Sequence, residues 1–205
     1  LADSGYAVTV IAKKELTEKN LASSEKIYNN VYINRPLKWE LPAFIRNRTS
    51  TSIFKKHLPN MLLMLKMIML GRKYDTDVYH AHDLNTLIQG VVSAKLRLQK
   101  KKLIYDSHEV QTSRTHYNFD RIYRIEKFLL QFTDAVIVEN DTRADYHADL
   151  YHKRPAALHN YSELYDAETV DAYPLREAYG IANDKKIILY QGGMQDGRGL
   201  FKLLE

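Results

Sequence analysis

Short apolar runs rich in β-branched and aromatic residues recur along the chain, and they constrain its fold more than any other feature. Most of them are continuously apolar rather than alternating, as in strands that are covered on both faces. Helical patterns separate the later runs, and this alternation predicts an α/β protein with a Rossmann-like parallel sheet and helices on both faces. The predicted strands lie at residues 7–12, 30–34, 77–82, 102–107, 135–140, 156–160 and 187–192, and the helices at 84–99, 118–133 and 141–151.

An acidic, turn-rich segment, SELYDAETVDAYP (162–174), marks a domain boundary. We therefore expect a first domain over 1–161, a linker over 162–173, and the start of a second Rossmann-like domain over 174–205. The first residues, from Leu1, are typical of the end of a helix, and the last residues are typical of the first turns of another helix. We expect the chain to be a piece of a larger protein, without the first strand of its first domain.

Composition narrows the possible partners. The chain has no cysteine, which excludes disulfides and thiolate chemistry and fits a cytoplasmic protein.

Residues 35–73 hold nine basic residues and one acidic residue, so an anionic partner is expected there. The apolar run 61–70 is about half the roughly 20 residues needed to cross a bilayer. A helix here can lie on an anionic membrane surface or pack in the core; no nucleic-acid motif accompanies it.

Polar or glycine residues follow five consecutive predicted strands. In parallel sheets, ligands bind beyond the carboxyl ends of the strands, so these residues predict one rim of a site. Each end taken singly can equally be a helix cap or a turn. The five ends are His82-Asp83, Ser107-His108-Glu109, Glu139-Asn140-Asp141, His159-Asn160 and Gln191-Gly192-Gly193.

The stretch DVYHAHD carries His80 and His82, which lie two apart and therefore face the same side of a strand. This pair can ligate zinc with help from Asp83, His108 or Glu109. Alternatively, His80 packs inside the sheet. His108 stands at the end of the next strand, where a neutral imidazole can hydrogen-bond a hydroxyl or a developing charge.

The turn QGGMQDGRG indicates a phosphate site. Gly192 and Gly193 allow close approach to the backbone, the following helix N-terminus favours an anion, and Arg198 adds a positive charge. A P-loop is excluded, because Arg198 stands where the lysine belongs and Gly199 where the magnesium-binding hydroxyl belongs.

The ordered set LADSGYAVTVIA, DVYHAHD, KLIYDSHE, FTDAVIVEN, LHNYSEL and LREAYGI…KKIILYQGGMQDGRGL resembles the family 4 (group 1) glycosyltransferases of the GT-B fold. The resemblance covers nearly the whole chain. It implies two Rossmann-like domains, an acceptor domain and a nucleotide-sugar domain, facing across a cleft. The implied reaction retains anomeric configuration and needs no metal.

The resemblance also implies residue roles. His108 would reach the donor sugar near its reacting carbon, and His82 and Asp83 would line the acceptor side. Donor contacts would come from Asn160, Gly192, Gly193 and Arg198. Gly193 replaces an arginine common in the family, so one of two expected cations is missing.

The expected activity is transfer of a sugar from a nucleotide-sugar to a glycan or lipid-linked acceptor, as in bacterial cell-surface polysaccharide synthesis, with residues 35–73 on the membrane. We expect this piece alone to be inactive. Three alternatives stay open: a nucleotide-sugar epimerase of the same fold, a metal hydrolase built on the histidines, and a non-catalytic carbohydrate-binding domain.

Overall fold

The computed structural model describes residues 1–14, 20–28, 30–37, 52–113, 117–161, 164, 174–194 and 199–204, with the side chains of 52–56 and 204 left out. The chain divides into two units, Leu1–Tyr161 and Ser162–Glu205, each of which is considered by itself. The predicted linker, 162–173, lies outside the described residues except for Leu164.

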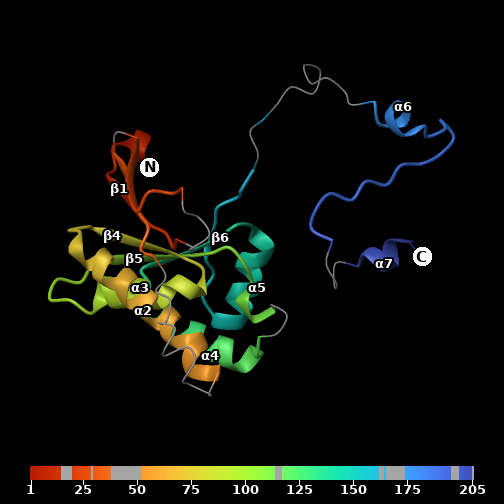
Figure 1. Ribbon diagram of the computed structural model, residues 1–205. Helices are drawn as coiled ribbons and strands as arrows, with labels where there is room; N and C mark the ends of the chain where they lie inside the picture. The colour runs from red at the N-terminus through yellow and green to blue at the C-terminus, as the bar shows by residue number, and fades with distance from the viewer. Residues whose placement is uncertain are drawn as a thin grey trace. The chain divides into compact units, whose positions relative to one another are not determined.

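The first unit is an α/β structure (Figure 1). Its predicted strands all form where the apolar runs lie, although several are shorter than their runs. Its elements are η1 (Ala2–Ser4), β1 (Val8–Ile11), β2 (Ser24–Tyr28), β3 (Val31–Asn34), α2 (Ser52–Lys73), β4 (Val78–His82), α3 (Leu84–Lys95), β5 (Lys102–Ser107), η2 (Gln111–Ser113), α4 (Phe119–Leu130), β6 (Ala135–Val138), α5 (Asp141–Tyr151) and β7 (Ala156–Ala157).

Four of these strands form an all-parallel sheet in the order β4-β5-β6-β7, and the α-helices α3, α4 and α5 lie between consecutive strands in the sequence. The Rossmann-like parallel sheet that the alternation predicts is confirmed, whereas helices on both of its faces stay a prediction. A second, smaller sheet has the order β1-β3-β2, in which β1 and β3 are parallel and β2 is antiparallel to β3. The apolar runs predict neither β2 nor the mixed character of this sheet.

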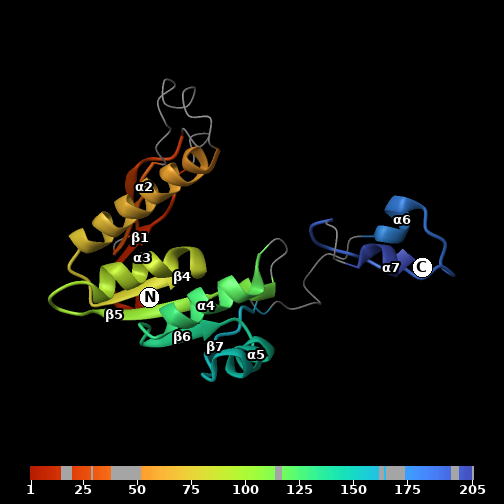
Figure 2. The ribbon, with the colours of Figure 1, turned by 90° about the horizontal axis from the view of Figure 1, so that it is seen from below.

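The core lies against one face of the four-stranded sheet. Side chains alternate across a strand, so Ala81, Leu103, Tyr105 and Val136 share this face. They pack against α3 and α4, and Figure 2 shows α3 running along β4. The core cluster comprises Ala81, Leu87, Val91, Ala94, Leu103, Tyr105, Leu129, Leu130 and Val136.

The opposite face of the same sheet has no buried residue in any of its four strands. Val78 is exposed, Ile104 and Ile137 are half-buried, and His80, His82 and Asp106 share this face with them. Polar side chains on this face therefore reach solvent, and that is what makes the candidate site accessible.

Helix α2 packs against α3 through one side, where Leu63 and Ile68 are buried. Met61, Leu65 and Met69, spaced four residues apart, form an exposed apolar stripe on another side. Core packing is confirmed for Leu63 and Ile68, and contact of the helix with a membrane surface stays a prediction. None of the helices in the described ranges combines the length and the apolar character that a bilayer crossing requires.

The second unit contains α6 (Leu175–Tyr179) and α7 (Leu200–Leu204). The predicted strand at 187–192 is wrong, because this segment is irregular and Ile188 and Leu189 are exposed. A strand needs a neighbour to satisfy its backbone groups, and no described residue of this unit forms one.

Candidate functional site

The carboxylate of Asp106 lies among three histidine side chains. Its Oδ2 is 3.1 Å from Nε2 of His80, 3.6 Å from Nδ1 of His82 and 3.5 Å from Nε2 of His108. The side chain of Asp106 is 17% exposed, whereas those of His82 and His108 are 60% and 52% exposed. The carboxylate thus forms the base of the cluster, and the imidazoles form its solvent-facing part.

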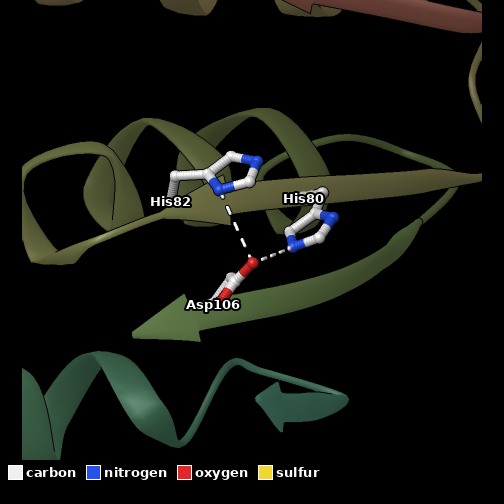
Figure 3. Close-up of side chains that lie close together, drawn as sticks. All are labelled: His80, His82 and Asp106. Atoms are coloured by element: carbon white, nitrogen blue, oxygen red, sulfur yellow. Dashed lines mark hydrogen bonds and ion pairs between the residues drawn. The ribbon is translucent and has the colours of Figure 1, made fainter. Parts of the chain in front are cut away.

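Strand register produces this cluster. His82 on β4 pairs with Asp106 on β5, and His80 precedes His82 by two residues on the same face. The rings of His80 and His82 stack with centroids 4.5 Å apart and an interplanar angle of 15°. Figure 3 shows that nitrogens of both rings point at the same Asp106 oxygen.

His82 and His108 contact each other directly at the ends of β4 and β5. Nδ1 of His82 lies 3.0 Å from Nε2 of His108, so one of these nitrogens carries a proton and donates a hydrogen bond to the other. Partial burial lowers the pKa of His82, and the neighbouring charge of His80 lowers it further. His82 is therefore a neutral imidazole near pH 7, able to accept or donate one hydrogen bond.

Asp83 adopts a backbone conformation that few non-glycine residues use, with φ 61° and ψ 164°. It precedes α3 at the N-cap position, yet its side chain does not cap that helix. Instead, its Oδ1 accepts hydrogen bonds from the backbone N–H of His108 at 3.1 Å and from Nε2 of Gln111 at 3.4 Å. The strained residue therefore ties the end of β4 to the loop that carries His108.

The His108 loop is also held from α5. The Arg143 guanidinium donates to the backbone carbonyl of His108 and pairs with Glu139. A cavity of about 20 Å³ beside the loop is lined by Glu109, Gln111 and Arg143 among others. It has room for about one water molecule, so a larger ligand does not fit inside it.

The other predicted site residues belong to other segments of the chain or lie outside the described ranges. Asn160 is exposed after β7. Gly192 has φ 152°, and the carbonyl of Gly193 accepts a hydrogen bond from the Tyr190 hydroxyl, both in the second unit. Arg198 lies outside the described residues. The rim residue Asn140 caps α5, since its Oδ1 accepts from the backbone N–H of Arg143; the cap reading of that strand end is correct.

Asp106 is the member of the cluster that sequence reasoning missed. It stands next to last in the strand 102–107 and looks like an ordinary strand-end polar residue. The available signal was its parity: with Leu103 and Tyr105 facing the core, Asp106 must face the side that carries His80 and His82. In the described part of the chain, His80, His82 and Asp106 are the group of three whose possible ligand atoms all lie within 4.8 Å of one another.

Comparisons with known proteins add no relative. No protein-family model matches the chain, and no curated protein matches it.

Proposed function

We propose that this chain supplies the acceptor-side domain of a glycosyltransferase that moves a sugar from a nucleotide-sugar to a glycan or lipid-linked acceptor. The proposal is based on the ordered motifs that resemble the GT-B family and on a Rossmann-like parallel sheet whose strand ends carry polar side chains. Ligands of such sheets bind beyond the carboxyl ends of the strands, where these side chains gather.

The observation that carries the proposal is the joining of two strand ends at His82, Asp83 and His108. Asp83 fixes the backbone of His108, and the imidazoles of His82 and His108 lie in contact. All three residues were candidates from the sequence, and the strained conformation of Asp83 is of the kind that clusters at functional sites.

These groups suit sugar chemistry. An imidazole pair can hydrogen-bond a sugar hydroxyl and take part in moving its proton. In the proposal His108 reaches the donor sugar near its reacting carbon, and His82 and Asp83 contact the acceptor. Asn160, Gly192, Gly193 and Arg198 belong to the donor side, and the diphosphate is stabilised by groups of the second domain.

Further parts of the proposal concern the larger protein. It would have a complete second Rossmann-like domain after the linker. It would act in the cytoplasm at an anionic membrane surface, where the basic residues of 35–73 and the exposed stripe Met61, Leu65 and Met69 would make contact.

The test is product analysis with the full-length protein and a panel of nucleotide-sugars and acceptors. We expect sugar transfer that falls by about 100-fold or more in His108→Ala, because a positioned proton-transfer group contributes on that order. His152→Asn is the matched control. It alters another exposed histidine, whose left-handed conformation (φ 58°) asparagine also adopts readily.

Unchanged turnover in His108→Ala, with the control also active, would remove His108 from the site. Interconversion of a nucleotide-sugar without any acceptor would instead identify an epimerase. Glycan binding with no turnover of any donor would identify a carbohydrate-binding domain.

A further inference from the structure

We infer that His80, His82 and Asp106 form a binding site for a divalent transition-metal ion of the zinc type on the open face of the four-stranded sheet. Two imidazoles and a carboxylate converge there, with the possible ligand atoms within 4.8 Å of one another (Figure 3). The site is additional to the proposed sugar transfer, which the GT-B resemblance describes as needing no metal.

The separations fit a single ion. Zinc lies about 2.1 Å from imidazole nitrogens and carboxylate oxygens, so two ligands of a tetrahedral site stand about 3.4 Å apart. Asp106 Oδ2 is 3.1 Å from Nε2 of His80 and 3.6 Å from Nδ1 of His82, and these distances bracket that value. The third pair of ligand atoms, on His80 and His82, lies within 4.8 Å, so the two imidazoles would shift toward each other when an ion binds.

The ligand set selects the class of ion. Imidazole suits zinc, copper, nickel and cobalt, whereas magnesium and calcium require a shell of oxygen ligands. Three protein ligands with a solvent-facing side are the arrangement of zinc sites that keep one position for water or substrate. Nε2 of His108, 3.0 Å from Nδ1 of His82 and 3.5 Å from Asp106 Oδ2, borders that fourth position.

The scaffold holds the ligands in place before the ion arrives. All three residues lie on two adjacent, paired strands, and stacking of the His80 and His82 rings sets their relative orientation. Ligands on rigid elements keep their geometry better than ligands on loops. The site also shares His82 with the proposed transfer site, so a bound ion and an acceptor would compete for that imidazole.

Zinc titration of the chelator-treated chain against a chromophoric competitor, with no sugar present, tests the inference. We expect one Zn²⁺ per chain and a rise in melting temperature, because the ion binds the folded state. His80→Ala and Asp106→Asn should each weaken binding at least tenfold, and excess Mg²⁺ should not displace the zinc. His159→Ala is the matched control: Nε2 of His159 lies 3.3 Å from Asp141 Oδ2, a histidine–aspartate pair outside the cluster.

Three results would overturn the site: no stoichiometric zinc binding at micromolar protein, unchanged affinity in both ligand variants, or an equal loss in His159→Ala. Melting in a chelator shows whether each variant folds, and the two ligand variants on different strands serve as checks on each other. Because His80 has no part in the proposed transfer, a zinc result is independent of whether the full-length protein transfers sugar.

Discussion

Glu126 is a charged residue in the interior of the first unit. It is 3% exposed, and its two carboxylate oxygens accept hydrogen bonds from the hydroxyls of Tyr105 and Tyr151, each at 2.6 Å. Burial raises the pKa of both phenols, and the Glu126 charge raises it further, so both remain protonated donors. A buried carboxylate is tolerable only with such partners, and here it joins β5, α4 and α5.

Glu126→Leu should therefore lower the free energy of unfolding by about 2 kcal/mol, because it leaves two buried hydroxyls without their charged acceptor. The combined variant Glu126→Leu, Tyr105→Phe and Tyr151→Phe should recover most of that loss, since removing all partners leaves no orphaned group. Urea denaturation measures both. A combined variant that is less stable than Glu126→Leu would show that the hydroxyls have other acceptors.

The roles of single residues could be predicted from the sequence to different degrees. Glu126 falls on the apolar stripe of α4 with Leu129 and Leu130, a visible anomaly in a predicted helix. His82, Asp83 and His108 were predicted as rim residues because strand ends can be located from the apolar runs. The bond from Asp83 to the His108 backbone could not be predicted, because it depends on a backbone conformation that aspartate seldom adopts.

At the level of elements, α3 packs tightly against the sheet at Gly90. A Cβ atom there would lie 2.8 Å from Leu103 Cδ1 and 3.1 Å from Ala81 Cβ, inside normal contact distance. Leu103 is fully buried, so it has little freedom to move aside. The missing side chain at position 90 is what lets α3 lie flat against β4 and β5.

Gly90→Val should destabilise the fold by about 1–3 kcal/mol, the usual cost of overpacking a filled core. Ile88→Val on the same helix is the control. Ile88 is 41% exposed, and its substitution should lower the free energy of unfolding by no more than about 0.5 kcal/mol. Thermal and urea unfolding of the two variants provide the comparison. Equal stability of Gly90→Val and the parent chain would mean that the helix can move away from the sheet without loss.

Helices and strands could be predicted where the apolar pattern of the segment itself shows which residues are buried. Continuous apolar runs located β4, β5 and β6, and α5 has the predicted bounds, 141–151. The run at 187–192 has the same composition but forms no strand, because pairing is supplied by a neighbour and not by the segment itself. The mixed sheet was missed for the converse reason: β2, SEKIY, has little apolar character and is a strand by virtue of pairing with β3.

At the scale of the whole molecule, the response of stability to pH should come from two histidines of the first unit. Burial lowers the pKa of His147, which is 6% exposed, and partial burial lowers that of His82. Nδ1 of His147 donates to the carbonyl of Lys153, and its buried Nε2 has no hydrogen-bond partner among the described residues. Protonation would place a charge at Nε2 with no acceptor, so the folded state resists it.

The carboxylates act in a separate pH range. Hydrogen bonds from Lys95, the backbone of Leu103 and Lys102 hold the pKa of Asp134 well below its usual value. A depressed carboxylate pKa contributes stability that is lost only as the pH falls below the unfolded value, about 3.9. The interval between pH 5 and pH 7 therefore isolates the histidines.

We expect the free energy of unfolding to fall as the pH drops below about 6.5, the ordinary histidine pKa, because the unfolded chain then takes up protons that the folded chain does not. The loss should level off once the pH passes below the folded pKa values. His147→Asn, whose amide can still donate to the Lys153 carbonyl, should reduce this slope while changing stability little at pH 8, where both states are neutral. Urea titrations from pH 8 to pH 5 in a chelating buffer keep zinc out of the measurement. A flat profile, or the same slope in His147→Asn, would show that the protons bind elsewhere.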